Sequence, residues 1–204
     1  MGLGKGEEMR PGTLSVQAWL VPGIVVLVAL ALMFGGDSGR ELLRFDRGGI
    51  AAGELWRLLT GHFVHLGVSH TLLNLAGLVL VWVLVGAACT WRQWLLVMVA
   101  SMTAIDLGLW FGSPQLEWYV GLSGLLHGML AAGIVAGLSD RNVEALILAV
   151  VVTGKLAWEQ FAGPLPGSEA TSGGAVIVDA HLYGVIGGTV AAAALIRVRR
   201  RAPI

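Results

Sequence analysis

Three polar residues from distant parts of the chain have side chains suited to acyl transfer: His70, Ser123 and His181. A serine hydroxyl becomes a useful nucleophile only when a base within hydrogen-bond reach takes its proton. An imidazole titrates near neutral pH, so His181 is the candidate base for Ser123. Attack on an amide places negative charge on the carbonyl oxygen, and this charge needs donors that are already in place. The chemistry therefore requires a fold that brings these three residues together.

Donors for that charge are predicted from two places. His70 and Asn74 are four residues apart, so on a helix they share one face and could both donate. The backbone N–H groups at the start of a helix beginning near Ser123 are unpaired and add to its positive end. No carboxylate is obviously placed to orient His181, because Asp179 is two residues away and faces elsewhere on a helix. The residues predict a Ser–His dyad.

Composition indicates an integral membrane protein. Hydrophobic residues make up 56% of the 204 residues and charged residues 13%, whereas a soluble domain has roughly 25% charged residues. The net charge is zero, so nothing suggests a nucleic-acid partner. Cys89 is the only cysteine, which excludes an internal disulfide and a cysteine-built metal site. We expect one membrane domain over residues 1–204, with the lipid bilayer as its surroundings.

Six segments are apolar and long enough to cross a bilayer, for which about 20 residues are needed. The sequence thus predicts an all-α bundle of six transmembrane helices. The first segment is predicted to be an anchor rather than a signal peptide, because no small-residue cleavage site follows Phe34. The predicted helices are 16–34, 69–88, 93–111, 122–138, 143–161 and 177–197.

The distribution of Lys and Arg predicts that both termini are cytoplasmic. In that orientation the helices 69–88, 122–138 and 177–197 all begin at the outer face, so His70, Ser123 and His181 lie at nearly the same depth. The inner side then holds Lys5, Arg10, Arg92, Arg141, Arg197, Arg199, Arg200 and Arg201, and the outer side only Arg40, Arg44, Arg47 and Arg57.

Two outer segments are predicted to be more than linkers. Residues 37–68 form a long loop with an amphipathic piece that we expect at the membrane interface. Residues 162–176 are rich in Gly, Pro and Ser, so we expect a mobile loop that could cover the site.

Small residues should allow the helices carrying the site to approach closely. Gly184 and Gly188 follow His181 on its face of the helix, and Gly124 and Gly128 form a row beside Ser123. Rows of small residues permit close backbone contact between membrane helices.

Charged residues within the predicted spans have two interpretations. A desolvated lysine can act as a general base, so Lys155 is a competing base for Ser123. The favoured interpretation is that Lys155 pairs with Glu159 and with Asp106, because charges inside a membrane usually pair.

A metal site is not predicted. His62, His65 and His70 could suggest zinc, but an H-E-x-x-H motif is absent and no cysteine assists. His62 and His65 are expected to tie the first loop to the core, and we expect no metal and no cofactor.

Four motifs, in order along the chain, resemble those of the rhomboid intramembrane serine proteases. The first is the Trp56–Arg57 pair in the first loop, and the second is HFVHLGVSHTLLN, with His65, His70 and Asn74 at the family spacing. The third is G-x-S-G at Gly121, Ser123 and Gly124, and the fourth is A-H-x-x-G-x-x-x-G at Ala180, His181, Gly184 and Gly188.

The resemblance implies an intramembrane serine endopeptidase. Ser123 would be the nucleophile and His181 the base, while His70 and Asn74, with Gly121 beside them, would bind the substrate carbonyl. The motif residues Trp56, Arg57, Gly184 and Gly188 would be structural. Many rhomboids carry a tyrosine four residues after the serine, whereas this chain has His127. His127 could pack on His181, carry a proton or anchor a loop.

The short chain and the GLSGLLHG stretch at 121–128 look most similar to the rhombosortase branch of bacterial rhomboids. That likeness implies a bacterial inner-membrane enzyme with its active site toward the periplasm. Its partners would be transmembrane or C-terminally membrane-anchored proteins, cleaved near the periplasmic end of a Gly-Gly sorting tail. The alternatives are a general rhomboid protease with other substrates, a non-catalytic rhomboid-like binder or chaperone of membrane clients, and a transporter or channel with a polar path.

Overall fold

The computed structural model describes residues 19–201, and this part of the chain is mostly helical. Within residues 19–201, four helical segments are long and apolar enough to cross a membrane: Val68–Ala88, Trp91–Gly112, Val143–Ala162 and Val178–Arg201. These segments are consistent with the predicted all-α membrane protein.

The helices that form these four segments begin and end within a few residues of the predicted ranges. Helix α5 (Val68–Val85) continues into η2 (Gly86–Ala88), and α6 (Trp91–Leu107) continues into the π-helical turn η3 (Gly108–Gly112). The other two are α8 (Val143–Ala162) and α10 (Val178–Arg201). Side chains cap two of the starts: Thr90 forms a capping box with Gln93 before α6, and Asn142 accepts backbone N–H groups before α8.

The other two predicted spans differ from long straight helices. Helix α1 (Leu20–Met33) is followed by α2 (Gly36–Leu43) at an angle of 117°, and the predicted start at residues 16–18 lies outside the described residues. Helix α7 (Ser123–Ser139) has 17 residues, about 25 Å at 1.5 Å per residue, against a bilayer core of about 30 Å. Six spans therefore remain a prediction.

Helix α10 packs against α7 and α6 with its backbone close to theirs. A Cβ atom added to Gly184 would collide with the carbonyl oxygen of Gly124, and one added to Gly188 would collide with that of Gly128. Only glycine at these positions permits this approach. The close contact predicted from the small residues is thus present, and it sets the start of α10 beside the start of α7.

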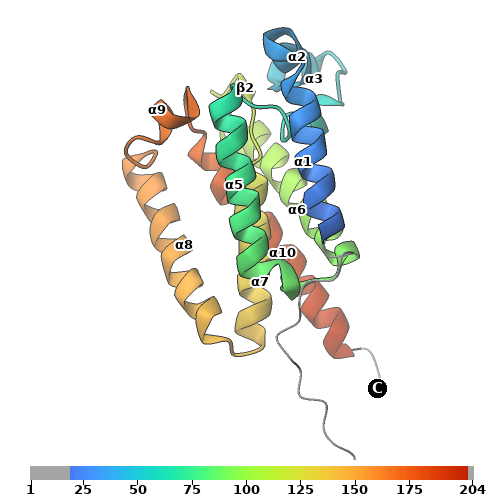
Figure 1. Ribbon diagram of the computed structural model, residues 1–204, viewed down its shortest axis with the longest axis vertical. Coiled ribbons are helices and arrows are strands. Elements are labelled where there is room, and N and C mark those ends of the chain that lie inside the picture. Colours follow the sequence, from blue (N-terminus) through green and yellow to red (C-terminus); the bar gives the residue numbers. More distant parts are fainter. Residues whose placement is uncertain (1–18, 202–204) are drawn as a thin grey trace, which may run out of the picture.

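Short elements gather at one end of the long helices, where α2, α3, α9 and β2 are labelled in Figure 1, while α10 ends at the opposite side of the molecule. They are α3 (Arg47–Ala51), α4 (Arg57–Thr60), α9 (Ser168–Ser172) and the two-residue strands β1 (Phe45–Asp46) and β2 (Trp118–Tyr119). The strands pair antiparallel, with Phe45 opposite Tyr119. This pairing joins the first loop to the segment that leads into α7.

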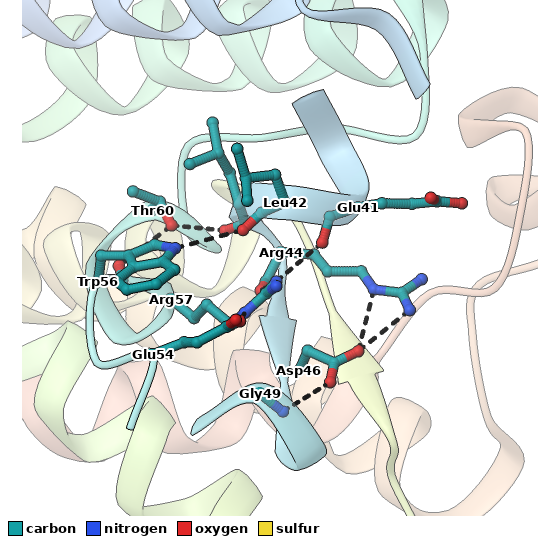
Figure 2. Close-up of polar contacts among 10 residues, drawn as sticks. Glu41, Leu42, Arg44, Asp46, Gly49, Glu54, Trp56, Arg57 and Thr60 are labelled. Carbon is teal, nitrogen blue, oxygen red and sulfur yellow. Dashed lines mark hydrogen bonds and ion pairs between the residues drawn. The ribbon is translucent and has the colours of Figure 1, made fainter. Parts of the chain in front are cut away.

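The Arg57 side chain joins several parts of the first loop by hydrogen bonds (Figure 2). Its guanidinium is buried and donates to the Glu54 carboxylate at 2.5 Å and to the backbone oxygens of Glu41 at 2.8 Å and Arg44 at 3.0 Å. One side chain therefore ties the end of α2 to the start of α4.

Two further contacts drawn in Figure 2 complete this loop. The indole N–H of Trp56 donates to the Leu42 carbonyl at 3.3 Å, and the Asp46 carboxylate accepts the Gly49 N–H at 3.0 Å. The bond from Gly49 lowers the pKa of the Asp46 carboxyl below its ordinary value.

Candidate active site

Ser123 and His181 are in hydrogen-bond contact. Ser123 is the first residue of α7, His181 lies in the first turn of α10, and the Ser123 Oγ to His181 Nε2 distance is 2.9 Å. His181 is buried at 4% exposure. A hydroxyl on the ring nitrogen of a buried imidazole is the geometry that a nucleophile and its base require.

His70 presents an N–H donor beside the start of α7. Its Nδ1 accepts the backbone N–H of Leu66 at 3.2 Å, so in the neutral ring the proton is on Nε2. A Cβ added to Gly121 would lie 3.0 Å from His70 Cε1 and 3.3 Å from Nε2. The protonated edge of His70 therefore faces the residue two positions before Ser123.

Asn74 lies on the same wall as His70. Its side chain is buried, and Nδ2 donates to the His70 carbonyl at 3.0 Å. An amide nitrogen carries two hydrogens, and this bond uses one of them. The backbone N–H of Ser123 is a further donor, because the first turn of a helix has no partner for its N–H groups within the helix.

Gly121 contributes through its backbone conformation. Its φ is +127°, its N–H donates to the Gly61 carbonyl at 3.1 Å, and its carbonyl accepts the Tyr119 hydroxyl at 2.6 Å. Because the N–H is already used, Gly121 does not offer it to a substrate oxygen. Its place in the site is the turn that starts α7.

Glu159 is the residue of the site whose place there the sequence did not predict. Its Oε2 lies 3.0 Å from His181 Nδ1, and both side chains are buried, at 3% and 4% exposure. The expectation that no carboxylate is placed to orient His181 is therefore wrong. The spacing of Lys155 and Glu159 on one helix face was visible, but the register of α8 against α10 was not.

Lys155 pairs with Glu159 as predicted, at 2.7 Å between Nζ and Oε2. Its Nζ also lies 2.8 Å from His127 Nε2 and 3.3 Å from His181 Nδ1. The expectation that Asp106 joins this pairing is wrong, because Asp106 Oδ1 lies 3.2 Å from His62 Nε2.

His127 packs flat on His181. The ring centroids are 4.2 Å apart at an interplanar angle of 19°. His127 Nδ1 donates to the Ser123 carbonyl at 2.7 Å, so its Nε2 is left to accept from Lys155. Ring packing on His181, one of the three predicted roles, is therefore a contact that the structure contains.

His62 and His65 are both buried near the first loop. His62 contacts Asp106 and lies edge-on to Tyr119, while His65 lies edge-on to His70 at 5.1 Å between centroids. Burial, together with repulsion from His70, lowers the pKa of His65 to about 3. His65 is therefore neutral at physiological pH.

Among the described residues, the group that could hold a metal ion is His127, Glu159 and His181, whose ligand atoms lie within 4.8 Å of one another. This is not the His62, His65 and His70 set considered from the sequence. The ammonium of Lys155 contacts a nitrogen or oxygen of all three. The Lys155 ammonium thus lies among these three side chains, where a metal ion would otherwise bind.

A cavity of about 570 Å³ contains the site. It lies between α5, α7 and α8, and the 165–176 segment with α9 forms another wall; the Ser69 hydroxyl donates to the Thr171 carbonyl and joins that segment to α5. The lining is mostly apolar, and its polar members include His70, Asn74, Ser123, His127, Lys155, Glu159 and His181. The predicted nucleophile, base and donors therefore share one cavity.

Comparison with known proteins supports a family assignment. The profile of the Rhomboid domain matches residues 52–198, more than half of the chain. A search among curated proteins found no individual match. The match and the apolar helices identify a multi-pass membrane protein. On this evidence the chain belongs to the rhomboid family, whose members are intramembrane serine proteases.

Proposed function

We propose that this protein is an intramembrane serine endopeptidase that cleaves a transmembrane segment of a client protein. The observation that carries the proposal is the 2.9 Å contact between Ser123 Oγ and His181 Nε2 on the wall of a largely apolar cavity. An apolar cavity between helices suits a lipid-soluble polypeptide, and the hydroxyl–imidazole pair suits attack on its backbone.

In the proposed reaction, His181 Nε2 takes the Ser123 proton as Oγ bonds to the substrate carbonyl carbon. His181 then gives that proton to the leaving nitrogen, the C–N bond breaks, and an acyl-enzyme remains on Ser123. A water molecule, deprotonated by His181, attacks the ester, and the proton returns to Ser123 as the new carboxyl end leaves.

The negative oxygen that forms in each step is stabilised by donors already in place. The protonated Nε2 of His70, the Asn74 amide and the backbone N–H of Ser123 are the proposed donors. Removing one oxyanion donor from a serine protease costs about 10²- to 10³-fold in turnover. The burial of Asn74 strengthens such a bond, because little water competes for the oxygen.

A helical substrate must unwind before it is cleaved, because its amides are hydrogen-bonded. We propose substrates with a C-terminal Gly-Gly tail, an apolar stretch and a basic end, as for rhombosortases. Glycine weakens a helix by about 1 kcal/mol relative to alanine, so a Gly-Gly pair eases that unwinding.

The proposed location is the bacterial inner membrane, with both termini cytoplasmic and the site near the periplasmic side. The basic side chains at the end of α10 support this orientation. In this proposal the 162–176 segment covers the site, and α8 moves aside to admit the substrate from the lipid.

The test is cleavage in liposomes of a model segment with Gly-Gly before an apolar stretch and a basic end. We expect the wild type to cleave it and Ser123→Ala and His181→Ala to lose at least about 10³-fold in rate. Ser139→Ala is the matched control at the far end of α7, where the hydroxyl accepts from Arg200 and lies outside the cavity that contains Ser123. Retained cleavage by Ser123→Ala would contradict the proposal.

The same assay separates the alternatives. Equal cleavage of a segment with Leu-Leu in place of Gly-Gly would favour a general rhomboid protease. Binding of the segment by the wild type without cleavage would favour a non-catalytic binder. Loss of cleavage in Lys155→Ala with full activity in His181→Ala would favour a Ser–Lys mechanism.

A further inference from the structure

We infer that Glu159 is a positioning residue that makes a Ser123–His181–Glu159 triad, and that Lys155 is the fixed counter-ion of its carboxylate. The inference rests on the proposed function and adds to it a third member from α8. The geometry that carries it is the 3.0 Å contact between Glu159 Oε2 and His181 Nδ1 in a buried setting.

The neutral ring of His181 has two tautomers, and the reaction needs one of them. To act as a base toward Ser123, His181 must keep a lone pair on Nε2, so its proton must be on Nδ1. A carboxylate beside Nδ1 accepts that proton's hydrogen bond and selects this tautomer. Without such an acceptor, either nitrogen of the ring could carry the proton.

Two groups lie within reach of His181 Nδ1, the Lys155 ammonium and the Glu159 carboxylate. Lys155 Nζ lies 3.3 Å from Nδ1, but an ammonium can only donate, and a bond from it would require the proton on Nε2. Lys155 has two shorter contacts, 2.7 Å to Glu159 and 2.8 Å to His127. The His181 Nδ1–H therefore donates to Glu159, and the Lys155 ammonium donates to Glu159 and His127.

Glu159 also stabilises the positive charge that forms on His181 during the reaction. When His181 takes the Ser123 proton it becomes an imidazolium, and the Glu159 carboxylate then lies in contact with a positive ring. Glu159 is 3% exposed, so water weakens this attraction little. The charge that develops during the reaction is thus stabilised where it forms.

Neighbouring side chains hold the Glu159 carboxylate in place. Lys155 binds the same carboxylate oxygen and His127 Nε2, and His127 Nδ1 donates to the carbonyl of Ser123. The contacts close a ring through Ser123, His181, Glu159, Lys155 and His127 that joins α7, α10 and α8. Stacking of His127 on His181 fixes the plane of the base.

A simpler role for Glu159 would be to neutralise Lys155 alone. The two roles predict different behaviour of the pair. If Glu159 only neutralises Lys155, replacing both by neutral residues of similar size restores activity. If Glu159 positions His181, the double variant stays impaired.

The pH dependence gives a readout that a purely structural role would not move. The titratable groups around His181 are His127 from α7, Lys155 and Glu159 from α8, and His70 from α5; α6 turns Asp106 to His62. Glu159 is the one carboxylate among them. Its removal therefore makes protonated His181 less stable and moves the acid limb of kcat/KM to lower pH.

The experiment measures kcat/KM against pH and the labelling of Ser123 by a fluorophosphonate, for the wild type, Glu159→Gln, Glu159→Asp and Lys155→Met/Glu159→Gln. Glu144→Gln is the matched control, because Glu144 is exposed at the start of α8. We expect Glu159→Gln to lose about 100-fold or more with its acid limb at lower pH. Glu159→Asp should regain part of the loss, the double variant should stay as low as Glu159→Gln, and Glu144→Gln should match the wild type.

Wild-type activity in Glu159→Gln, or in the double variant, would overturn the inference and leave the proposed function intact. A lower rate with an unmoved acid limb would also overturn it, since that pattern fits a structural role. A wild type that neither cleaves nor labels would contradict the proposed function itself.

Discussion

At the scale of single residues, the conformation of Gly121 decides how the Ser123 side chain is presented to the cavity. Its φ of +127° is one that residues with a side chain rarely adopt, and a Cβ there would press on the His70 ring at 3.0 Å. The backbone turn before Ser123 and the proposed oxyanion donor therefore depend on the same missing side chain.

The variant Gly121→Ala tests this dependence. We expect it to lower the free energy of unfolding by about 1–3 kcal/mol from backbone strain and to reduce cleavage further by shifting His70. Thermal unfolding in detergent and kcat/KM are the measurements. Gly154→Ala on α8 is the control, because nothing lies within 4 Å of a Cβ there. Equal stability and activity in both variants would contradict this role of Gly121.

Site residues could be predicted where residue type and the depth of a helix mark them, and not where only the rotation of one helix against another brings them into contact. Ser123, His181, His70 and Asn74 are marked by residue type and by the predicted depth of their helices, and the structure sets them around one cavity. The contact of Glu159 with His181 joins two helices whose relative rotation no spacing reveals. The pairing of Asp106 was mispredicted for the same reason. Its depth on α6 was predicted, but the rotation of α6 turns it to His62.

At the scale of elements, helix α8 contributes residues to the site although most of its side chains are not buried. It carries Glu159 and Lys155, yet few of its side chains are buried: Ala145, Val152, Leu156 and Glu159. Leu156 and Val152 pack with Ile134 of α7 in a small cluster. The packing of this cluster therefore sets how firmly Glu159 is held against His181.

Shortening Leu156 should loosen that hold. Leu→Ala in a soluble core costs about 2–5 kcal/mol, and between membrane helices the packing part of this cost remains. We expect Leu156→Ala to lower both the unfolding temperature and kcat/KM. Val151→Ala is the control, since Val151 is 60% exposed on the same helix. A rise in kcat/KM would contradict the account, because α8 would then limit substrate access more than it positions Glu159.

The helices themselves were predictable to different degrees for physical reasons. Long apolar runs gave the bounds of α5, α6, α8 and α10, because apolar length decides what can span a bilayer. The bend after α1 was not predicted; it falls at Gly36, whose φ is +57°. Helix α7 is short yet buried along most of its length. Its apolar side chains therefore pack against the neighbouring helices, whereas hydropathy alone predicts that they face lipid.

At the scale of the whole molecule, orientation in the membrane decides which side the site serves. In Figure 1, α9 lies at the end of the molecule where α8 ends. Helix α8 starts, and α10 ends, at the opposite end of the molecule. The basic residues Arg199, Arg200 and Arg201 end α10. The positive-inside rule then predicts that α9 and the cavity lie near the outer face.

Single cysteines introduced into a Cys89→Ser background test this orientation. We expect Glu169→Cys in α9 to react with a membrane-impermeant maleimide on intact spheroplasts, and Glu144→Cys at the start of α8 to react only after permeabilisation. Both residues are exposed, so accessibility within the protein is matched. The reverse pattern would contradict cytoplasmic termini and a periplasmic site.

The most direct measurement of the central claim is where a fluorophosphonate attaches to the purified protein. An activated serine reacts with this probe, whereas a packing serine does not. Mass spectrometry should find the wild type labelled at Ser123 and His181→Ala unlabelled, although both retain the Ser123 hydroxyl. No label on Ser123, or equal labelling with and without His181, would contradict the account.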